Sequence, residues 1–263
     1  MTGLRKNVAL LAVSFAVLCP VMFARPRVFA GSRREPRVLY VTQSKGFKHA
    51  VLPESEQVMR ELAARHGFAL TVTQEAERYI TPDGLKGFDV LVFFTTGELP
   101  LSEGQKAALL DFVRTGKAFV GVHSATDTFY GWPEYGELIG GRFASHPWGE
   151  FEATVRVVDR KHPAARHLSE RFKLTDEVYV FKEFKAGLVN VVMRLEAGGL
   201  DLNKKGLEQV NARDFPLAWW RGYGKGRVFY TALGHRPEVW RDERFRKMLV
   251  GAIRWGASRR AVR

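Results

Sequence analysis

The sequence has 263 residues, of which 46% are apolar and 12% aromatic, and this is enough for one large domain with a substantial core. The formal net charge of +13 is dispersed along the chain and follows no nucleic-acid-binding motif. We therefore predict no nucleic-acid partner, and interpret the charge as a property of solubility or of association with anionic surfaces.

The chain begins with the pattern of a secretory signal peptide. Arg5 and Lys6 precede an uncharged apolar run over residues 8–18, and small residues precede two plausible cleavage points, after Ala24 or after Ala30. The apolar run is shorter than the roughly 20 residues that a membrane-spanning helix needs. We expect an exported protein, periplasmic or extracellular, with no membrane span after processing.

Removal of residues 1–30 leaves residues 31–263, which we expect to form a single α/β domain. The removed segment contains four basic residues and no acidic one, so the formal charge of the remainder is +9. Cys19, the single cysteine of the chain, is removed as well. The mature chain is therefore expected to have neither disulfides nor thiol chemistry.

From position 37 onward, strand-like segments alternate with helical ones. Short apolar runs predict strands over residues 38–41, 68–72, 88–94 and 118–122, with helices over 53–67 and 102–116 between them. Such alternation predicts parallel β-α-β units with helices on both faces of the sheet. The fold class expected is therefore α/β, a doubly wound and mostly parallel sheet of the flavodoxin-like type.

The second half of the chain is richer in strands. Residues 153–158, 177–181 and 189–195 predict a β-rich elaboration at one edge of the sheet, residues 217–220 and 227–232 a closing pair of strands, and residues 243–255 a final helix.

Polar residues at the carboxyl ends of parallel strands are the best candidates for a site, because ligands of open α/β sheets bind there. By this rule the candidates are His49 after the first strand, Glu98 after the third, His123, Ser124 and Asp127 after the fourth, and His235 after the late strand over residues 227–232. His146 lies in a loop that can fold over the same edge. We expect His123 and His235 to share one site.

Three stretches carry a resemblance to a known family. They are VLYVTQSKGFKH, FVGVHSATDTFYGWPEYGELIGGRFASHPW and PLAWWRGYGKGRVFYTALGH, and they resemble the blocks of the ThuA-like (trehalose-utilisation) family, over about residues 37–255. The resemblance implies a fold similar to that of class I glutamine amidotransferases. It also implies a link to carbohydrate metabolism, including the processing of keto sugars.

The resemblance also shows a difference in chemistry. Class I amidotransferases place a cysteine at the sharp turn after the strand, and a downstream His-x-Pro-Glu supplies the base and its orienting acid. Here the turn residue is His123, whereas His235 and the following Arg236, Pro237 and Glu238 resemble the downstream element. Without a thiol there is no thioester, so we predict no glutamine amidotransferase activity.

Several uses of these residues remain open. His49, His123 and His235 can bind a divalent metal, most plausibly zinc, with Glu98 or His146 as a further ligand. Alternatively, the histidines act as general acid and base without a metal, one of them oriented by Asp127 or Glu98. In a third scheme, Ser124 is a nucleophile and His235 its base.

Aromatic residues near the predicted site point to a sugar as the ligand. Tyr130, Trp132 and Trp148, together with His146, are expected to bind the substrate. The function predicted is that of a hydrolase, lyase or isomerase acting on a carbohydrate or an oxidised (keto) sugar. The alternative is a non-catalytic carbohydrate-binding or envelope-associated module.

Overall fold

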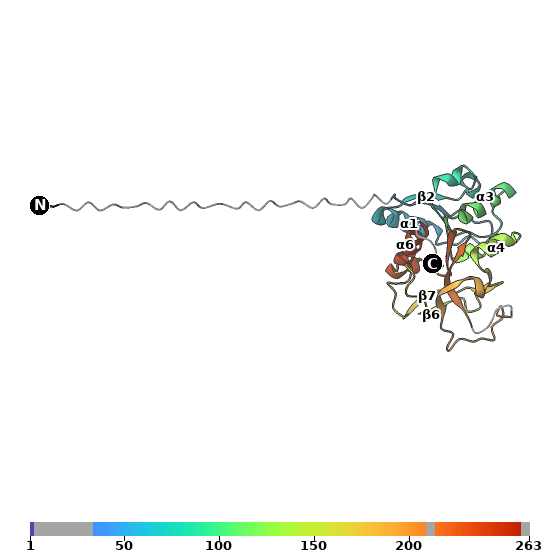
Figure 1. Cartoon of the computed structure of the whole chain (residues 1–263). Helices are drawn as coiled ribbons and strands as arrows, with labels where there is room; N and C mark the ends of the chain where they lie inside the picture. Colours follow the sequence, from blue (N-terminus) through green and yellow to red (C-terminus); the bar gives the residue numbers. More distant parts are fainter. Residues whose placement is uncertain (3–33, 209–213, 259–263) are drawn as a thin grey trace. The chain divides into compact units, whose positions relative to one another are not determined.

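A computed structural model describes residues 1–2, 34–208 and 214–258 of the chain (Figure 1). Apart from its first two residues, the predicted signal peptide lies outside the described residues. Every helix and strand described belongs to the unit formed by Glu35–Arg263. Within the described residues, no helix combines the length and the apolar character needed to cross a membrane.

A nine-stranded sheet forms the centre of this unit, and one half of it is parallel. Its order is β2-β1-β3-β4-β11-β10-β9-β6-β7. The parallel strands are β2 (Ala69–Thr73), β1 (Arg37–Val41), β3 (Val90–Phe93), β4 (Ala118–Val122) and β11 (Gly226–Thr231). Strands β3 and β4 are buried along their whole length, as their continuous apolar sequences predict.

The other half of the sheet is antiparallel. It consists of β10 (Pro216–Tyr223), β9 (Asn190–Leu195), β6 (Glu150–Val157) and β7 (Arg171–Glu177). A separate pair, β5 (Arg142–Ser145) with β8 (Val180–Lys182), completes the strands. The predicted edge elaboration is confirmed, but the strand expected over residues 177–181 is wrong, because the chain leaves β7 at Glu177 and resumes pairing only at Val180.

Helices cover both faces of the parallel half (Figure 1). They are α1 (Leu52–His66), α2 (Ala76–Tyr79), α3 (Glu103–Arg114), α4 (Pro133–Ile139), α5 (Pro237–Arg241) and α6 (Glu243–Gly256), with short 3-10 turns η1 (Gly84–Gly87), η2 (His123–Thr126) and η3 (Ala186–Leu188). Ser102 caps α3 through a capping box with Gln105, as its position before the helix predicts.

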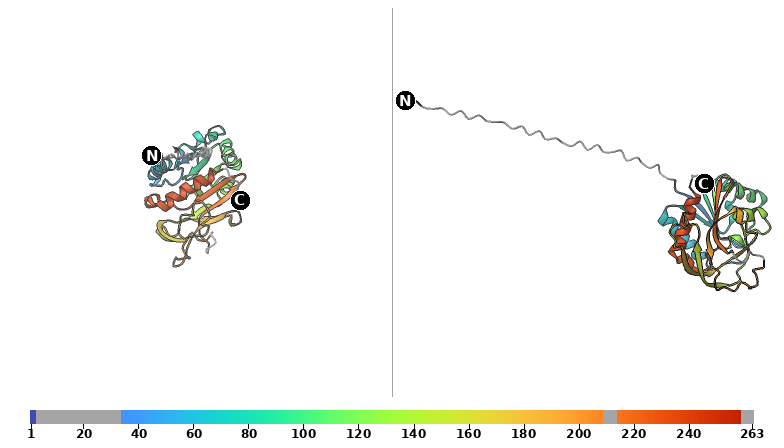
Figure 2. Two further views of the ribbon diagram at one scale, coloured as in Figure 1. Left: turned by 60° about the vertical axis from the view of Figure 1, so that its left-hand side comes forward. Right: turned by 60° about the horizontal axis from the view of Figure 1, so that its bottom comes forward.

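Helix α6 runs beside α1 (Figure 2). Arg254 donates to the backbone oxygen of His66 at 2.8 Å, and Arg246 reaches Glu61 at 3.2 Å. These contacts join the last helix to the first on one face of the sheet.

The sheet cannot be flat, because its two halves meet at one point. Four strands lie between β4 and β7 in the sheet order. With a strand spacing of about 4.8 Å, a flat sheet would hold the two strands roughly 24 Å apart. Nevertheless, a carboxylate oxygen of Glu177, at the end of β7, lies 3.7 Å from Nε2 of His123, which follows β4. The antiparallel half therefore curls back over the carboxyl ends of the parallel strands.

Candidate metal centre

Four side chains from distant parts of the chain converge above the parallel strands. His49, His123, Glu177 and His235 each offer one ligand atom, and these atoms all lie within 4.8 Å of one another. The ring centroids of the three histidines are 5.0 to 5.3 Å apart. The structure thus brings together the three histidines that the sequence predicted for a metal site and adds a carboxylate to them.

His123 occupies the sharp turn after β4. Its φ is +45°, in the left-handed region, which among non-glycine residues of the described ranges is shared only by Phe129 and Glu183. Its Nδ1 lies 2.7 Å from the backbone oxygen of Ala232. Because only a protonated nitrogen can donate to a carbonyl, the proton is on Nδ1, and the lone pair of Nε2 points into the cluster.

His235 is oriented in a similar way by a carboxylate. Its Nε2 lies 3.4 Å from Glu150, whereas its Nδ1 lies 3.3 Å from Oε2 of Glu177. Within the described ranges, neither Nδ1 of His235 nor Nε2 of His123 makes a hydrogen bond, although both atoms are buried. A ligand that accepts electron pairs would satisfy both nitrogens at once.

His49 reaches the cluster from the loop after β1. The side chain is 3% exposed, and its Nδ1 is a buried atom that likewise makes no hydrogen bond to the described residues. Burial, followed by the neighbouring His123 and His235, lowers the pKa of His49 from 6.5 to about 3. The imidazole is therefore neutral near pH 7, which is the form that binds metals.

Glu177 connects the cluster to its surroundings through its two oxygens. Oε2 faces His123 and His235, and Oε1 lies 3.4 Å from Nδ1 of His146. The imidazole of His146 is half-exposed. Glu177 thus lies between the buried histidines and a solvent-accessible one.

The four donors fit a zinc ion in number and type. Three imidazoles and one carboxylate suit Zn²⁺, and a tetrahedral site with bonds of about 2.1 Å separates its ligand atoms by roughly 3.4 Å. The distances of 3.3 and 3.7 Å from Glu177 to His235 and His123 are close to that value. The second nitrogens of these two histidines face a carboxylate and a carbonyl, as those of metal-bound histidines usually do.

The other predicted catalytic residues lie outside this cluster. Glu98 is exposed and accepts a hydrogen bond from the backbone of Gly131 at 3.0 Å. Asp127 accepts a 2.6 Å hydrogen bond from the Tyr130 hydroxyl. Neither carboxylate orients a histidine. Ser124 is fully buried, and its Oγ makes no hydrogen bond within the described residues, so no Ser124–His235 pair is present there.

The predicted substrate-binding aromatics differ in their exposure. Tyr130 is 40% exposed. Trp132 is only 6% exposed and packs against Phe129 in the core. Trp148 is partly buried and donates to the backbone oxygen of Asp201. Trp132 and Trp148 therefore serve packing in this structure, whereas Tyr130 and His146 remain accessible beside the cluster.

Two site residues, Glu177 and Glu150, were missed in the sequence. The signal for Glu177 was present, because residues 171–175 alternate between polar and apolar and are followed by two adjacent acidic residues. Glu150 gave no such signal. It takes the place expected of Glu238, whose carboxylate instead pairs with Arg236.

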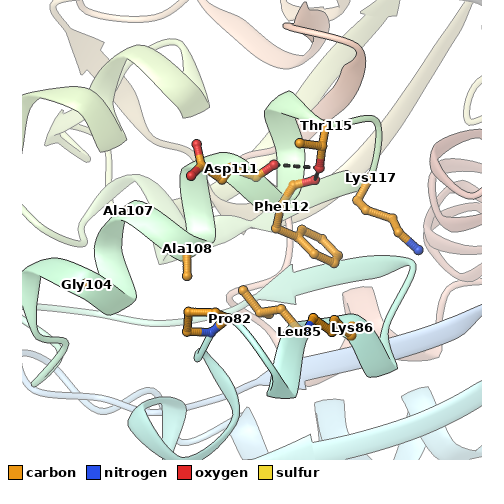
Figure 3. Close-up of a pocket in the computed structure, with 10 residues that line it drawn as sticks. All are labelled: Pro82, Leu85, Lys86, Gly104, Ala107, Ala108, Asp111, Phe112, Thr115 and Lys117. Atoms are coloured by element: carbon orange, nitrogen blue, oxygen red, sulfur yellow. Dashed lines mark hydrogen bonds between the residues drawn. The ribbon is translucent and has the colours of Figure 1, made fainter.

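A separate cavity of about 430 Å³ lies between α3 and η1 (Figure 3). Its lining is mainly apolar and includes Leu85, Ala108 and Phe112. It shares no residue with the histidine cluster.

Comparison with known proteins places this chain in a family. A family model described as ThuA, trehalose utilisation, matches residues 37–256. The chain belongs to the ThuA family. This membership supports a carbohydrate-related role. No curated protein matches the chain.

Solved structures of ThuA-like proteins are similar to this chain. A putative ThuA-like protein from Bacteroides uniformis is 25% identical, with a TM-score of 0.72 over 89% of this chain and 96% of the other. One from Parabacteroides merdae is 16% identical, with a TM-score of 0.67 over 88% and 92%. PurLQS from Thermotoga maritima, 15% identical, has a TM-score of 0.52 over 84% and 99% and shares the fold alone. The predicted ThuA-like, amidotransferase-like fold class is confirmed.

Proposed function

We propose that this ThuA protein is an exported, zinc-dependent enzyme that acts on a carbohydrate or on an oxidised (keto) sugar. The observation that carries the proposal is the orientation of His123 and His235. Each turns a buried nitrogen, without a hydrogen bond in the described part of the chain, toward the carboxylate of Glu177. An arrangement of unpaired lone pairs around a carboxylate is costly unless a cation is bound there.

His49, His123, Glu177 and His235 would hold the ion. Bound zinc supplies Lewis-acid activation of a sugar carbonyl or of a water molecule. The remaining residues provide proton transfer. His146, half-exposed and 3.4 Å from Glu177, is placed to exchange protons with solvent.

A second proton-transfer group lies beside the cluster. Burial raises the pKa of Asp127, although its hydrogen bond from Tyr130 acts in the opposite direction. A carboxyl group that holds its proton to higher pH is a better general acid toward a leaving group. Hydrolysis, elimination and isomerisation of a keto sugar can all use this arrangement.

Elemental analysis of the mature protein, prepared with added zinc, tests the proposal. We expect about one zinc per chain in the wild type and almost none in His49→Ala or His123→Ala. His66→Ala is the control, because that residue ends helix α1 and lies outside the cluster. A wild-type protein that stays free of metal after this preparation would contradict the proposal and leave acid–base catalysis or binding without turnover.

Turnover then separates an enzyme from a binding module. A panel of glycosides and their keto forms should be converted by the zinc-loaded wild type and not by His123→Ala. A module would bind the sugars without converting any of them. The proposed export depends on residues 1–30 alone, and mass spectrometry of the mature N-terminus tests it.

A further inference from the structure

We propose that Phe47 forms the stacking surface on which the sugar ring of the substrate lies. This inference rests on the proposed function and names the part of the site that recognises the sugar. The substrate class is a pyranose or ketopyranose with one open C–H face. That face would contact the phenyl ring, and a hydroxyl or carbonyl group would reach the histidine cluster.

Phe47 is unusually exposed for its type. It is 66% exposed, more than any other large apolar side chain in residues 34–208 and 214–258. Its ring centroid lies 4.9 Å from that of His49, with the two planes at 83°. The most exposed phenyl ring therefore lies directly beside a proposed metal ligand.

The loop that carries Phe47 is held firmly, so the exposure is a property of the fold. Thr96 donates its hydroxyl to the backbone oxygen of Phe47 at 2.8 Å and accepts at its own backbone oxygen from Lys45, also at 2.8 Å. Gly97 has a φ of +73°, and a Cβ on it would lie 2.5 Å from the nitrogen of Gly46. Such close backbone contact fixes the loop and holds the phenyl ring in water, where a ligand can bury it.

Phe94 and Tyr179, the other aromatic side chains that contact the three histidines, are buried. The aromatic residues predicted to bind the substrate are already engaged. Trp132 lies in the core, and Trp148 packs against Phe151 and Phe215. The ring of Tyr130 has the Lys182 ammonium group 4.9 Å from its centroid.

Phe47 combines an accessible ring with proximity to the histidines. Sugars bind aromatic rings through their C–H faces while polar groups fix their orientation. The cluster supplies those polar groups beside the ring.

The experiment measures sugar binding and metal content on the same samples. The probes are trehalose, methyl α-D-glucopyranoside and its 3-keto derivative, titrated calorimetrically into zinc-loaded wild type, Phe47→Ala, Phe47→Trp and Leu188→Ala. Leu188 is the matched control because it is 59% exposed and belongs to η3, outside the cluster. Zinc per chain is determined for each variant.

We expect Phe47→Ala to bind the best probe about ten-fold more weakly, and Phe47→Trp to bind within about two-fold of wild type. Leu188→Ala should match wild type, and zinc content should be equal in all four proteins. Unchanged affinity of Phe47→Ala, an equal loss in Leu188→Ala, or no binding of any probe by the wild type would each overturn the inference. A wild type without zinc whose sugar affinity still depends on Phe47 would contradict only the proposed metal function.

Discussion

The carboxylate of Asp176 accepts a hydrogen bond from the backbone N–H of Gly234 at 2.7 Å, and its other oxygen accepts one from the backbone N–H of Arg236 at 3.0 Å. Asp176 is fully buried and precedes Glu177, whereas Gly234 precedes His235. One side chain thus joins the end of β7 to the loop after β11, and thereby holds two proposed metal ligands together.

Asp176→Asn should destabilise the fold and weaken zinc binding. An amide offers one acceptor where the carboxylate offers two, so one backbone N–H loses its partner, and we expect the free energy of unfolding to fall by about 1–3 kcal/mol. Urea unfolding and a zinc titration measure the two effects. Asp83→Asn, at an exposed ion pair with Lys86, is the control and should change neither. If the variant equalled wild type in stability and zinc affinity, the hydrogen bonds of Asp176 would not be what holds the two ligands together.

Glu177→Gln and Glu150→Gln should differ in their effect on zinc. The first replaces a direct donor, and the second only the group that orients His235. We expect Glu150→Gln to weaken zinc binding by roughly 10–100-fold and Glu177→Gln to weaken it more. Competition with a chromogenic chelator measures the zinc dissociation constants of both variants. The reverse order would contradict the assignment of Glu177 as a ligand.

His162 should make the protein less stable in acid. It is 5% exposed and stacks against Trp220 and Phe229, and burial lowers its pKa to about 4, although the Asp159 carboxylate acts in the opposite direction. Arg227, over the Trp255 ring, is a further charge on the surrounding elements. The unfolded chain, with an ordinary pKa of 6.5, binds the proton more readily.

The difference between the pKa of His162 in the unfolded and in the folded chain contributes stability that is fully present above pH 6.5 and is lost as the pH falls toward 4. The loss amounts to about 3 kcal/mol. Chemical denaturation of His162→Phe between pH 7 and pH 4 should therefore show a shallower decline than wild type. If the free energy of unfolding fell equally with pH in the two proteins, His162 would be excluded as the source of the acid sensitivity.

Gly97→Ala and Gly104→Ala should have opposite effects on stability. At Gly97 the left-handed backbone and the contact with Gly46 leave no room for a methyl group, so we expect a loss of about 2 kcal/mol or more. Gly104 lies in helix α3 at the cavity of Figure 3, where an added Cβ meets nothing within 4 Å. Alanine there should stabilise by about 0.5 kcal/mol. Thermal unfolding of both variants measures this contrast.

The parallel half of the fold was predictable because its signals are local. Buried parallel strands such as β3 and β4 appear as continuous apolar runs, and each proposed histidine ligand lies in the segment that follows such a strand. To predict the fourth donor, Glu177, one would have had to know how the sheet curves. Glu177 ends β7, the strand of the antiparallel half that is farthest from β4 in the sheet order, and no pattern in the sequence shows that this edge turns back. The burial of Trp132 was equally hidden, since its neighbours Phe129 and Tyr135 form an aromatic cluster only after folding.

The four donors span positions 49 to 235, almost the full length of the described domain. An ion bound to them would act as a non-covalent cross-link between the first strand region, the sheet's far edge and the segment before the last helices. Because the ion would bind the folded state alone, it would shift the folding equilibrium in proportion to the logarithm of the free ion concentration. For this protein, the supply of metal in its compartment would thus set the stability of the fold along with its chemistry.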